Sequence, residues 1–201
     1  MSNEPTSPTA PCFHAVVLAA GAGTRFGGGK LRADWNGRPL ICAAVSAACA
    51  SPAESVTLVT GADPEVAEAA RCGCHIPLVV VQAMDWSDGL AASLKAGFSS
   101  APANAKGVFV FLGDMPRVPH ELAGKLAEAL TGGASAAAPV HGGRRGHPVL
   151  VGPALMPAVA RLEGDKGLGD LLDTLGTQLA LVETADAGVL FDVDTPDALA
   201  G

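Results

Sequence analysis

Short, unbroken runs of apolar residues recur along this chain, and segments with the composition of helices alternate with them. Strands are expected at 14–19, 55–60 (SVTLVT), 76–81 (IPLVVV) and 107–112 (GVFVFL). Helices are expected at 39–50, 64–71, through 93–98, and at 119–130. Strands that are apolar at every position are buried on both faces, and their alternation with helices is typical of parallel sheets. The sequence therefore predicts an α/β fold with a mostly parallel, Rossmann-like sheet and helices on both faces.

The second half of the chain has a looser rhythm. After residue 132, short strands are expected at 134–140, 148–151, 178–183 and 189–192, and short helices at 153–161 and 167–175. The 201 residues contain no internal repeat and no linker long enough to separate two domains. We expect a disordered leader over 1–11 and one domain over 12–201, whose second half forms the acceptor side.

Charge and composition argue against several classes of partner. A net charge of −7 disfavours nucleic acid or an anionic membrane, although a local group of amides and cations can still bind a small phosphate ligand. No run reaches the roughly 18 apolar residues of a spanning helix. Residues 1–11 hold three prolines and lack the basic and apolar regions of a signal peptide. We therefore expect a cytoplasmic protein.

The five cysteines have no metal-site spacing. Cys42 and Cys49 lie seven residues apart on a predicted helix, which places them on one buried face. Cys12, Cys72 and Cys74 form no CxxC pair. We expect all five to be structural.

A glycine-rich loop follows the first predicted strand. It runs from Leu18 to Lys30 with the sequence LAAGAGTRFGGGK. The dinucleotide fingerprint G-x-G-x-x-G does not fit, because Phe26 stands where its last glycine is required. The P-loop does not fit either, because Thr24 replaces its first glycine and Leu31 the hydroxyl residue after its lysine.

The loop still has the chemistry of a phosphate site. Glycines let the backbone approach a polyphosphate and present consecutive N–H donors. Arg25 offers a planar fork of donors, and Lys30 a mobile positive charge. The loop also leaves the carboxyl end of a strand, where open α/β sheets bind ligands. The alternative is a flexible turn with two solvated cations.

The loop resembles the L-A-A-G-x-G/S-x-R-M-G-x-x-K segment of the nucleotidyltransferase superfamily with the MobA-like fold, with Phe26 in place of the usual methionine. The resemblance implies a sheet of the nucleotide-diphospho-sugar transferase type and a loop that binds a nucleoside triphosphate. It implies that Arg25 and Lys30 neutralise the triphosphate in catalysis. The nucleotide contacts that it implies come from Leu18, Ala19, Ala20, Gly21, Gly23, Arg25 and Lys30.

Two acidic motifs extend the resemblance. Residues 112–116 (LGDMP) are similar to the family's segment whose aspartate binds catalytic Mg²⁺, which implies this role for Asp114. A hard oxygen ligand at a strand end suits Mg²⁺. Residues 192–196 (DVDTP) resemble a D-I-D-T-P ending and imply Asp194 as the second metal ligand, with Asp192 as the other candidate. Local capping by Asp114 or Asp194 is the alternative.

The segment 86–97 resembles the family's W-x-x-G-x-x-x-S-L-x-x-G. This similarity implies that Gly89 and Ser93 lie near the base and ribose. The alternative is a helix capped by Asp88, with Ser93 as a core hydroxyl.

Residues 143–149 (GRRGHPV) resemble the G-x-x-G-H-P-V segment of the molybdenum-cofactor branch. They imply that Arg145 and His147 approach a pterin substrate. The turn 164–167 (GDKG) also matches this branch, but Leu168 and Gly169 replace its usual Ala-Arg, which removes a cation.

The resemblance implies a Mg²⁺-dependent transfer of a nucleotide to molybdopterin or molybdenum cofactor with release of pyrophosphate. The Leu-Ala-Ala-Gly start resembles that of cytidylyltransferases, so CTP is expected first and GTP second. An NADPH-dependent reductase and a non-catalytic carrier serving a molybdenum hydroxylase remain the alternatives. No nucleic-acid or membrane partner is expected.

Overall fold

The computed structural model describes residues 12–71, 74 and 76–200. The leader expected over 1–11 and Cys72 lie outside the described residues. An eight-stranded sheet has the order β10-β7-β9-β6-β1-β4-β5, with β8 paired to β7. Its strands are β1 (Phe13–Ala19), β4 (Ala53–Thr60), β5 (Leu78–Gln82), β6 (Gly107–Leu112), β7 (Ala136–His141), β8 (Arg144–Arg145), β9 (Val149–Val151) and β10 (Leu179–Glu183).

The sheet is mostly parallel, as the sequence predicted. β1 pairs in parallel with β4 and β6, β4 with β5, and β10 with β7. β9 runs antiparallel between β6 and β7. The register sets Ala19 opposite Thr60 and Leu18 opposite Leu112. The carboxyl ends of three neighbouring strands therefore meet at one edge.

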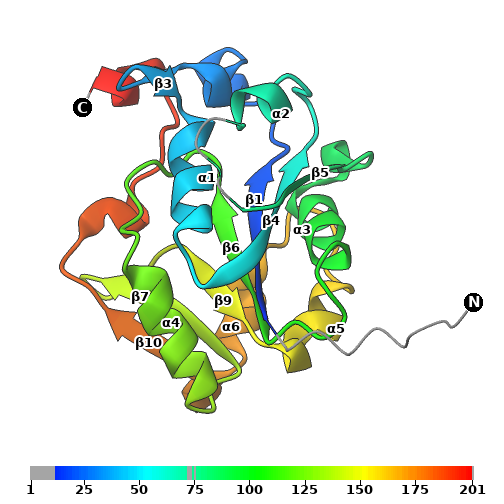
Figure 1. The fold of residues 1–201 in the computed structure, drawn as a ribbon, viewed down its shortest axis with the longest axis vertical. Helices are drawn as coiled ribbons and strands as arrows, with labels where there is room; N and C mark the ends of the chain where they lie inside the picture. The colour runs from blue at the N-terminus through cyan, green and yellow to red at the C-terminus, as the bar shows by residue number, and fades with distance from the viewer. Residues whose placement is uncertain (1–11, 72–73, 75, 201) are drawn as a thin grey trace, which may run out of the picture.

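Helices cover both faces of the sheet, and each face has its own core. α1 (Ile41–Cys49) and α4 (Leu122–Thr131) lie on the front in Figure 1, whereas α3 (Leu90–Ser99), α5 (Met156–Val159) and α6 (Leu168–Asp173) pack on the other face. Side chains alternate along a strand. Ala15 and Val17 accordingly join the first core, and Val16 and Leu18 the second. Cys42 and Cys49 are both buried on α1, as expected.

The helix expected from Pro39 begins at Ile41 instead, because a hairpin precedes it. β2 (Asp34–Trp35) and β3 (Arg38–Pro39) pair antiparallel across Asn36 and Gly37. Both turn residues have positive φ, 53° and 82°. Asn-Gly is the pair that such two-residue hairpin turns favour.

Three further expectations need correction. The strand expected at 189–192 is not formed, since a 3₁₀ turn covers Ala187–Leu190 and the Asp186 carboxylate accepts a hydrogen bond from Gly188 N at its start. The helix expected over 64–71 shortens to α2 (Val66–Ala69). Asp88 does not cap α3, because Gly89 is the N-cap and no side chain bonds there.

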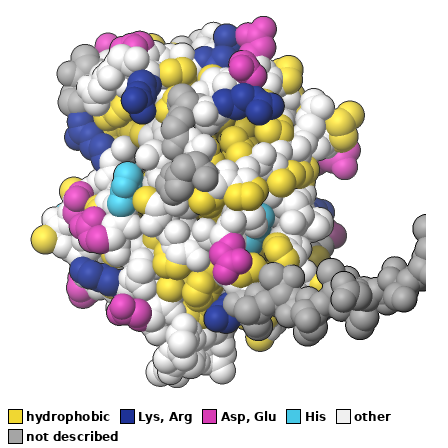
Figure 2. Space-filling view, viewed as in Figure 1, with side chains coloured by type: hydrophobic (Ala, Val, Ile, Leu, Met, Phe, Trp, Pro, Cys, Tyr) yellow, Lys and Arg dark blue, Asp and Glu magenta, His cyan; other side chains and the backbone are white. Residues whose placement is uncertain are grey.

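Charged side chains are mixed on the face shown in Figure 2, where Lys and Arg lie among Asp and Glu and form no single basic patch. Within the residues that the structure describes, no helix has the length and apolar character needed to cross a bilayer.

Candidate functional site

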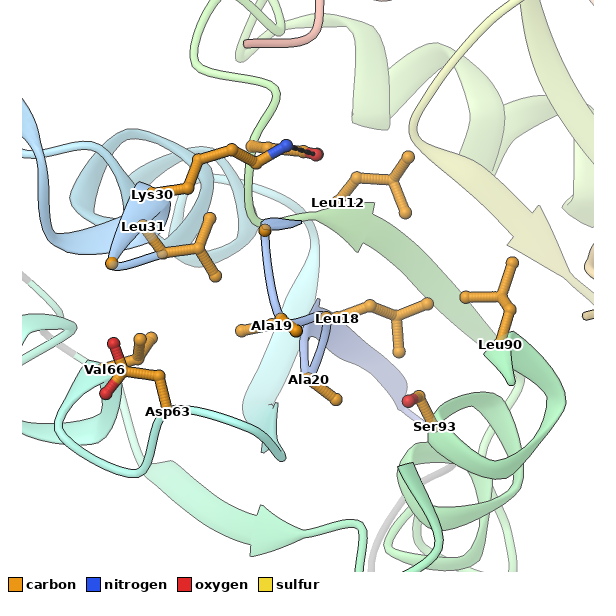
Figure 3. Close-up of a pocket in the computed structure, with 15 residues that line it drawn as sticks. Leu18, Ala19, Ala20, Lys30, Leu31, Asp63, Val66, Leu90, Ser93 and Leu112 are labelled. Carbon is orange, nitrogen blue, oxygen red and sulfur yellow. Dashed lines mark hydrogen bonds and ion pairs between the residues drawn. The ribbon is translucent and has the colours of Figure 1, made fainter. Parts of the chain in front are cut away.

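A cavity of about 280 Å³ opens at the carboxyl edge of the sheet, where β1, β4 and β6 end together. Figure 3 shows Leu18, Ala19 and Ala20 at its floor, Lys30 and Leu31 on one side, and Leu90 and Ser93 on the other. Most residues expected to bind nucleotide line it, namely Leu18, Ala19, Ala20, Gly21, Gly23, Lys30 and Ser93, and so does Asp114, the expected metal ligand. The structure therefore brings together motifs that lie almost a hundred residues apart in the chain.

The glycine loop presents free backbone donors to this cavity. Gly23 has a left-handed φ of 58°, and Phe26 N and Gly28 N both donate to its carbonyl, at 3.0 and 3.2 Å. Within the described residues, the amides of Gly21 and Ala22 donate to no other backbone carbonyl. Consecutive unpaired N–H groups of this kind form an anion-binding concavity.

Asp114 reaches the loop because Gly113 passes close to β1. Gly113 N donates to Leu18 O at 2.9 Å, and a Cβ on Gly113 would lie 3.0 Å from that oxygen and 2.9 Å from Ile41 Cδ1. A side chain at this position would crowd Leu18 O and the end of the Ile41 side chain, and glycine avoids that crowding. The carboxylate that follows is thus held at the edge of the cavity.

Four charged side chains form a continuous group, here called the charged cluster: Arg25, Lys30, Asp114 and Asp194. Lys30 Nζ donates to Asp114 Oδ2 at 2.7 Å, a contact dashed in Figure 3, and to Asp194 Oδ1 at 3.3 Å. Arg25 donates to Asp194 Oδ2 at 3.0 Å. The Lys30 side chain is only 12% exposed, so water screens its pairs weakly. One cationic nitrogen therefore bridges both carboxylates.

Asp194, rather than Asp192, belongs to the charged cluster. The segment that carries Asp194 is held against the loop after β6 by a hydrogen bond from Val193 N to Asp114 O at 3.0 Å. Asp192 instead lines a separate cavity next to Asp114, Arg144 and His147.

A second cavity, of about 270 Å³, adjoins the first and shares Leu18, Leu90 and Leu112 with it. Arg145 and His147, the residues that the family resemblance implies near a pterin substrate, both line this cavity. Arg145 donates to the Asp173 carboxylate at 2.7 Å and to Gly169 O at 3.3 Å. The remaining wall is mainly aliphatic, from α3, β6, β9 and α6.

Burial lowers the pKa of His147 below its ordinary value of 6.5, and the positive charge of Arg145 acts in the same direction. The Val110 carbonyl and the negative charge of Asp114 oppose that shift. His147 Nδ1 lies 3.5 Å from Val110 O. The imidazole is therefore neutral at neutral pH.

Two of the expected nucleotide contacts lie outside the first cavity. Arg25 is 81% exposed in its side chain and reaches the site through Asp194. Gly89 packs against the turn at Gly164 and Asp165, where its φ of 111° and the space left for Cβ both exclude other residues. Ala91 N donates to Gly164 O at 3.0 Å. Backbone conformation and packing alone therefore explain why residue 89 is a glycine.

Sequence reasoning missed the wall opposite α3. Asp63 and Val66, which follow β4, line the first cavity, and Arg32 pairs with Asp63 at 2.8 Å. The signal was present, because Asp63 follows a buried strand just as Asp114 does. The argument from the carboxyl ends of parallel strands applies to both residues.

Comparison with known proteins shows the family of this chain. A family model described as the MobA-like NTP transferase domain matches residues 15–181. The nicotine blue oxidoreductase of Paenarthrobacter nicotinovorans is 32% identical over 198 residues, covering 94% of this chain and 95% of that protein. The molybdenum cofactor cytidylyltransferase of Escherichia coli strain K12 is 29% identical over 184 residues, covering 90% and 91%.

Solved structures share the fold. The Rv0371c protein of Mycobacterium tuberculosis H37Rv superposes with a TM-score of 0.80 at 26% identity, covering 96% of this chain and 97% of that one. A nucleotidyl transferase from Methanothermobacter thermautotroptrophicus gives 0.77 at 26% identity, covering 94% of each. The chain belongs to the MobA-like NTP transferase family and is a nucleotidyltransferase.

Proposed function

We propose that this protein transfers the nucleotide of a nucleoside triphosphate, CTP in the first place and GTP in the second, to molybdopterin or molybdenum cofactor. The observation that carries the proposal is the first cavity, which is lined by the glycine loop together with Lys30, Ser93 and Asp114. This combination provides donors for phosphate oxygens, a cation, and a carboxylate for a metal ion.

Mg²⁺ is the cofactor in this proposal, and the charged cluster fits it. Mg²⁺ prefers carboxylate oxygens and is held by one or two of them together with substrate phosphates and water. Asp114 and Asp194 would hold it, since the ammonium of Lys30 already contacts both carboxylates. When bound, the ion would neutralise and orient the reacting phosphate.

The reaction needs no protein base. An anionic phosphate oxygen of the acceptor forms a bond to the α-phosphorus, and the bond from that phosphorus to pyrophosphate breaks. Arg25, Lys30 and the loop amides would stabilise the charge on the departing pyrophosphate. The protein contributes in-line positioning and charge neutralisation.

The acceptor would occupy the second cavity, which meets the first at Leu18, Leu90 and Leu112. Arg145 and the neutral His147 are the polar groups that would orient a pterin ring there. The similarity to the cytidylyltransferase of Escherichia coli supports both this acceptor and CTP. Gly169 stands where the related proteins have an arginine, and the guanidinium of Arg145 donates to the Gly169 carbonyl in the wall of this cavity.

A reductase is the second candidate, because a relative with 32% identity is named an oxidoreductase. The interrupted glycine fingerprint at Phe26 weighs against NADPH in this loop. A carrier that delivers molybdenum cofactor to a hydroxylase client would use the second cavity alone.

The test is incubation of the purified protein and Mg²⁺ with each triphosphate and molybdenum cofactor, with pyrophosphate release as the readout. We expect release with CTP, less with GTP, and none without acceptor. A parallel incubation replaces the triphosphate with NADPH and follows its oxidation. NADPH oxidation with no pyrophosphate from any triphosphate would establish the reductase, and tight binding of molybdenum cofactor with neither reaction would establish the carrier.

A further inference from the structure

Three side chains, each from a different segment, stack on one another. The guanidinium carbon of Arg117 lies 4.1 Å from the ring centroid of Phe191 and 5.5 Å from that of Trp35. The two ring centroids are 6.1 Å apart. In Figure 1 the red C-terminal segment lies beside the blue hairpin that carries β3. We call these three residues the arginine–aromatic stack.

The members of the stack are near neighbours in sequence of the charged cluster. The pairs are Trp35 with Lys30, Arg117 with Asp114, and Phe191 with Asp194. The stack thus joins the three segments that carry Lys30 and both carboxylates.

The position of Asp194 depends on tertiary contacts more than the position of Asp114 does. Asp114 follows the buried strand β6, whereas residues 191–194 form neither helix nor strand. Two further contacts press this segment onto the loop after β6: the bond from Val193 N to Asp114 O, and the approach of Gly188 to the Arg117 carbonyl, which leaves no room for a Cβ. These backbone contacts and the packing of the Phe191 ring on Arg117 and Trp35 together hold the segment that carries Asp194.

We propose that the arginine–aromatic stack is a positioning element that holds Asp194 against Lys30 and Asp114, so that both carboxylates can ligate one divalent cation. The inference rests on the proposed function, because it assigns Asp194 to the metal site. Phe191 and Arg117 act through Asp194 and touch neither substrate nor metal.

The test is a double-mutant cycle read by Mn²⁺ binding to the full chain, measured from the EPR signal of free Mn²⁺. Mn²⁺ takes the same oxygen ligands as Mg²⁺. Phe191→Leu should weaken binding roughly tenfold, the scale on which residues that orient metal ligands act. Asp194→Asn should also weaken it, and the double variant should bind no worse than Asp194→Asn alone. Arg117→Met should act in the same direction as Phe191→Leu, and it provides the test if Phe191→Leu does not fold.

Phe13→Leu is the matched control. Phe13 is also a partly buried ring in an aromatic pair, 5.6 Å from Phe109, but at the opposite end of β1. Its replacement should leave Mn²⁺ affinity unchanged. Normal Mn²⁺ affinity in Phe191→Leu and Arg117→Met, or losses that add in the double variant, would overturn the stack's role while leaving the proposed function intact. A wild-type protein that binds no Mn²⁺ would overturn the metal site and the inference together.

Discussion

The carboxylate of Asp114 lies 2.7 Å from the Lys30 ammonium, at the end of a buried strand. Asp114→Asn keeps the shape of the side chain and removes its negative charge. Turnover should fall at least about a hundredfold, as when other preorganised electrostatic groups are lost. Folding should survive, because Lys30 keeps Asp194 as a partner at 3.3 Å.

Turnover and melting temperature should be measured on the same Asp114→Asn protein. An active variant that is less stable by about 1 kcal/mol would show that Asp114 merely caps its turn.

His147 offers a second test among single residues, because it lies on the second cavity and not on the first. His147→Ala should raise the KM for the acceptor while CTP affinity stays near the wild-type value. Burial keeps the imidazole neutral, so its hydrogen bond to the acceptor should not vary with pH above 6.5. Equal losses of CTP and acceptor binding would show that His147 supports the fold or the nucleotide site.

Sequence and structure agree best at single residues wherever a motif follows a strand. Lys30 and Asp114 could be placed near one another because parallel strands end at a common edge, whereas Ser93 was placed beside them by the family resemblance of 86–97. The contacts of Gly89 and Phe191 could not be predicted. They depend on the approach of segments distant in sequence, which residue patterns do not encode.

Among the elements, the long apolar strands and Ala-rich helices were predictable, since burial on both faces leaves an unbroken apolar pattern. The hairpin at Asp34–Pro39 is too short to show a period, although its Asn-Gly turn was a usable signal. The sequence of 189–192 predicts a strand, yet a 3₁₀ turn that begins after Asp186 covers Ala187–Leu190 and so takes in half of this segment.

The start of α3 depends on Gly89, and this can be tested at the level of the element. Gly89→Ala should lower the free energy of unfolding by about 1–3 kcal/mol, because a non-glycine residue is strained at its φ of 111° and its Cβ would collide with the backbone carbonyl of Gly164. Gly124→Ala in α4 is the control. The added Cβ would contact nothing within 4 Å, so the free energy of unfolding of this variant should rise by up to about 1 kcal/mol. Urea unfolding measures both, and equal effects would refute the packing of α3 on the 164–165 turn.

For the whole molecule, the sheet separates the candidate site from a buried polar group at its other end. His14 is 2% exposed, with Nδ1 2.8 Å from Ser55 Oγ and Nε2 3.0 Å from Thr57 Oγ1. Burial lowers its pKa from 6.5 to about 4. The unfolded chain therefore binds more protons than the folded one between these values, and the stability that this group contributes is complete above pH 6.5 and falls as the pH drops toward 4.

Unfolding free energies of the wild type and of His14→Gln, measured across that pH range, should fall more steeply for the wild type, because both proteins keep His147 but only the wild type keeps His14. Parallel curves for the two proteins would contradict the lowered pKa of His14.

The central claim is that a nucleotide moves from a triphosphate to an acceptor bound beside it. The most direct measurement follows CTP labelled at its α-phosphorus, incubated with Mg²⁺, molybdenum cofactor and the protein. We expect the label to appear covalently on the cofactor with the wild type, and at least about a hundredfold more slowly with Asp114→Asn. The same experiment is repeated with the other triphosphates. Label that stays in the triphosphate, or appears only in the free nucleoside monophosphate, in every case would contradict the account.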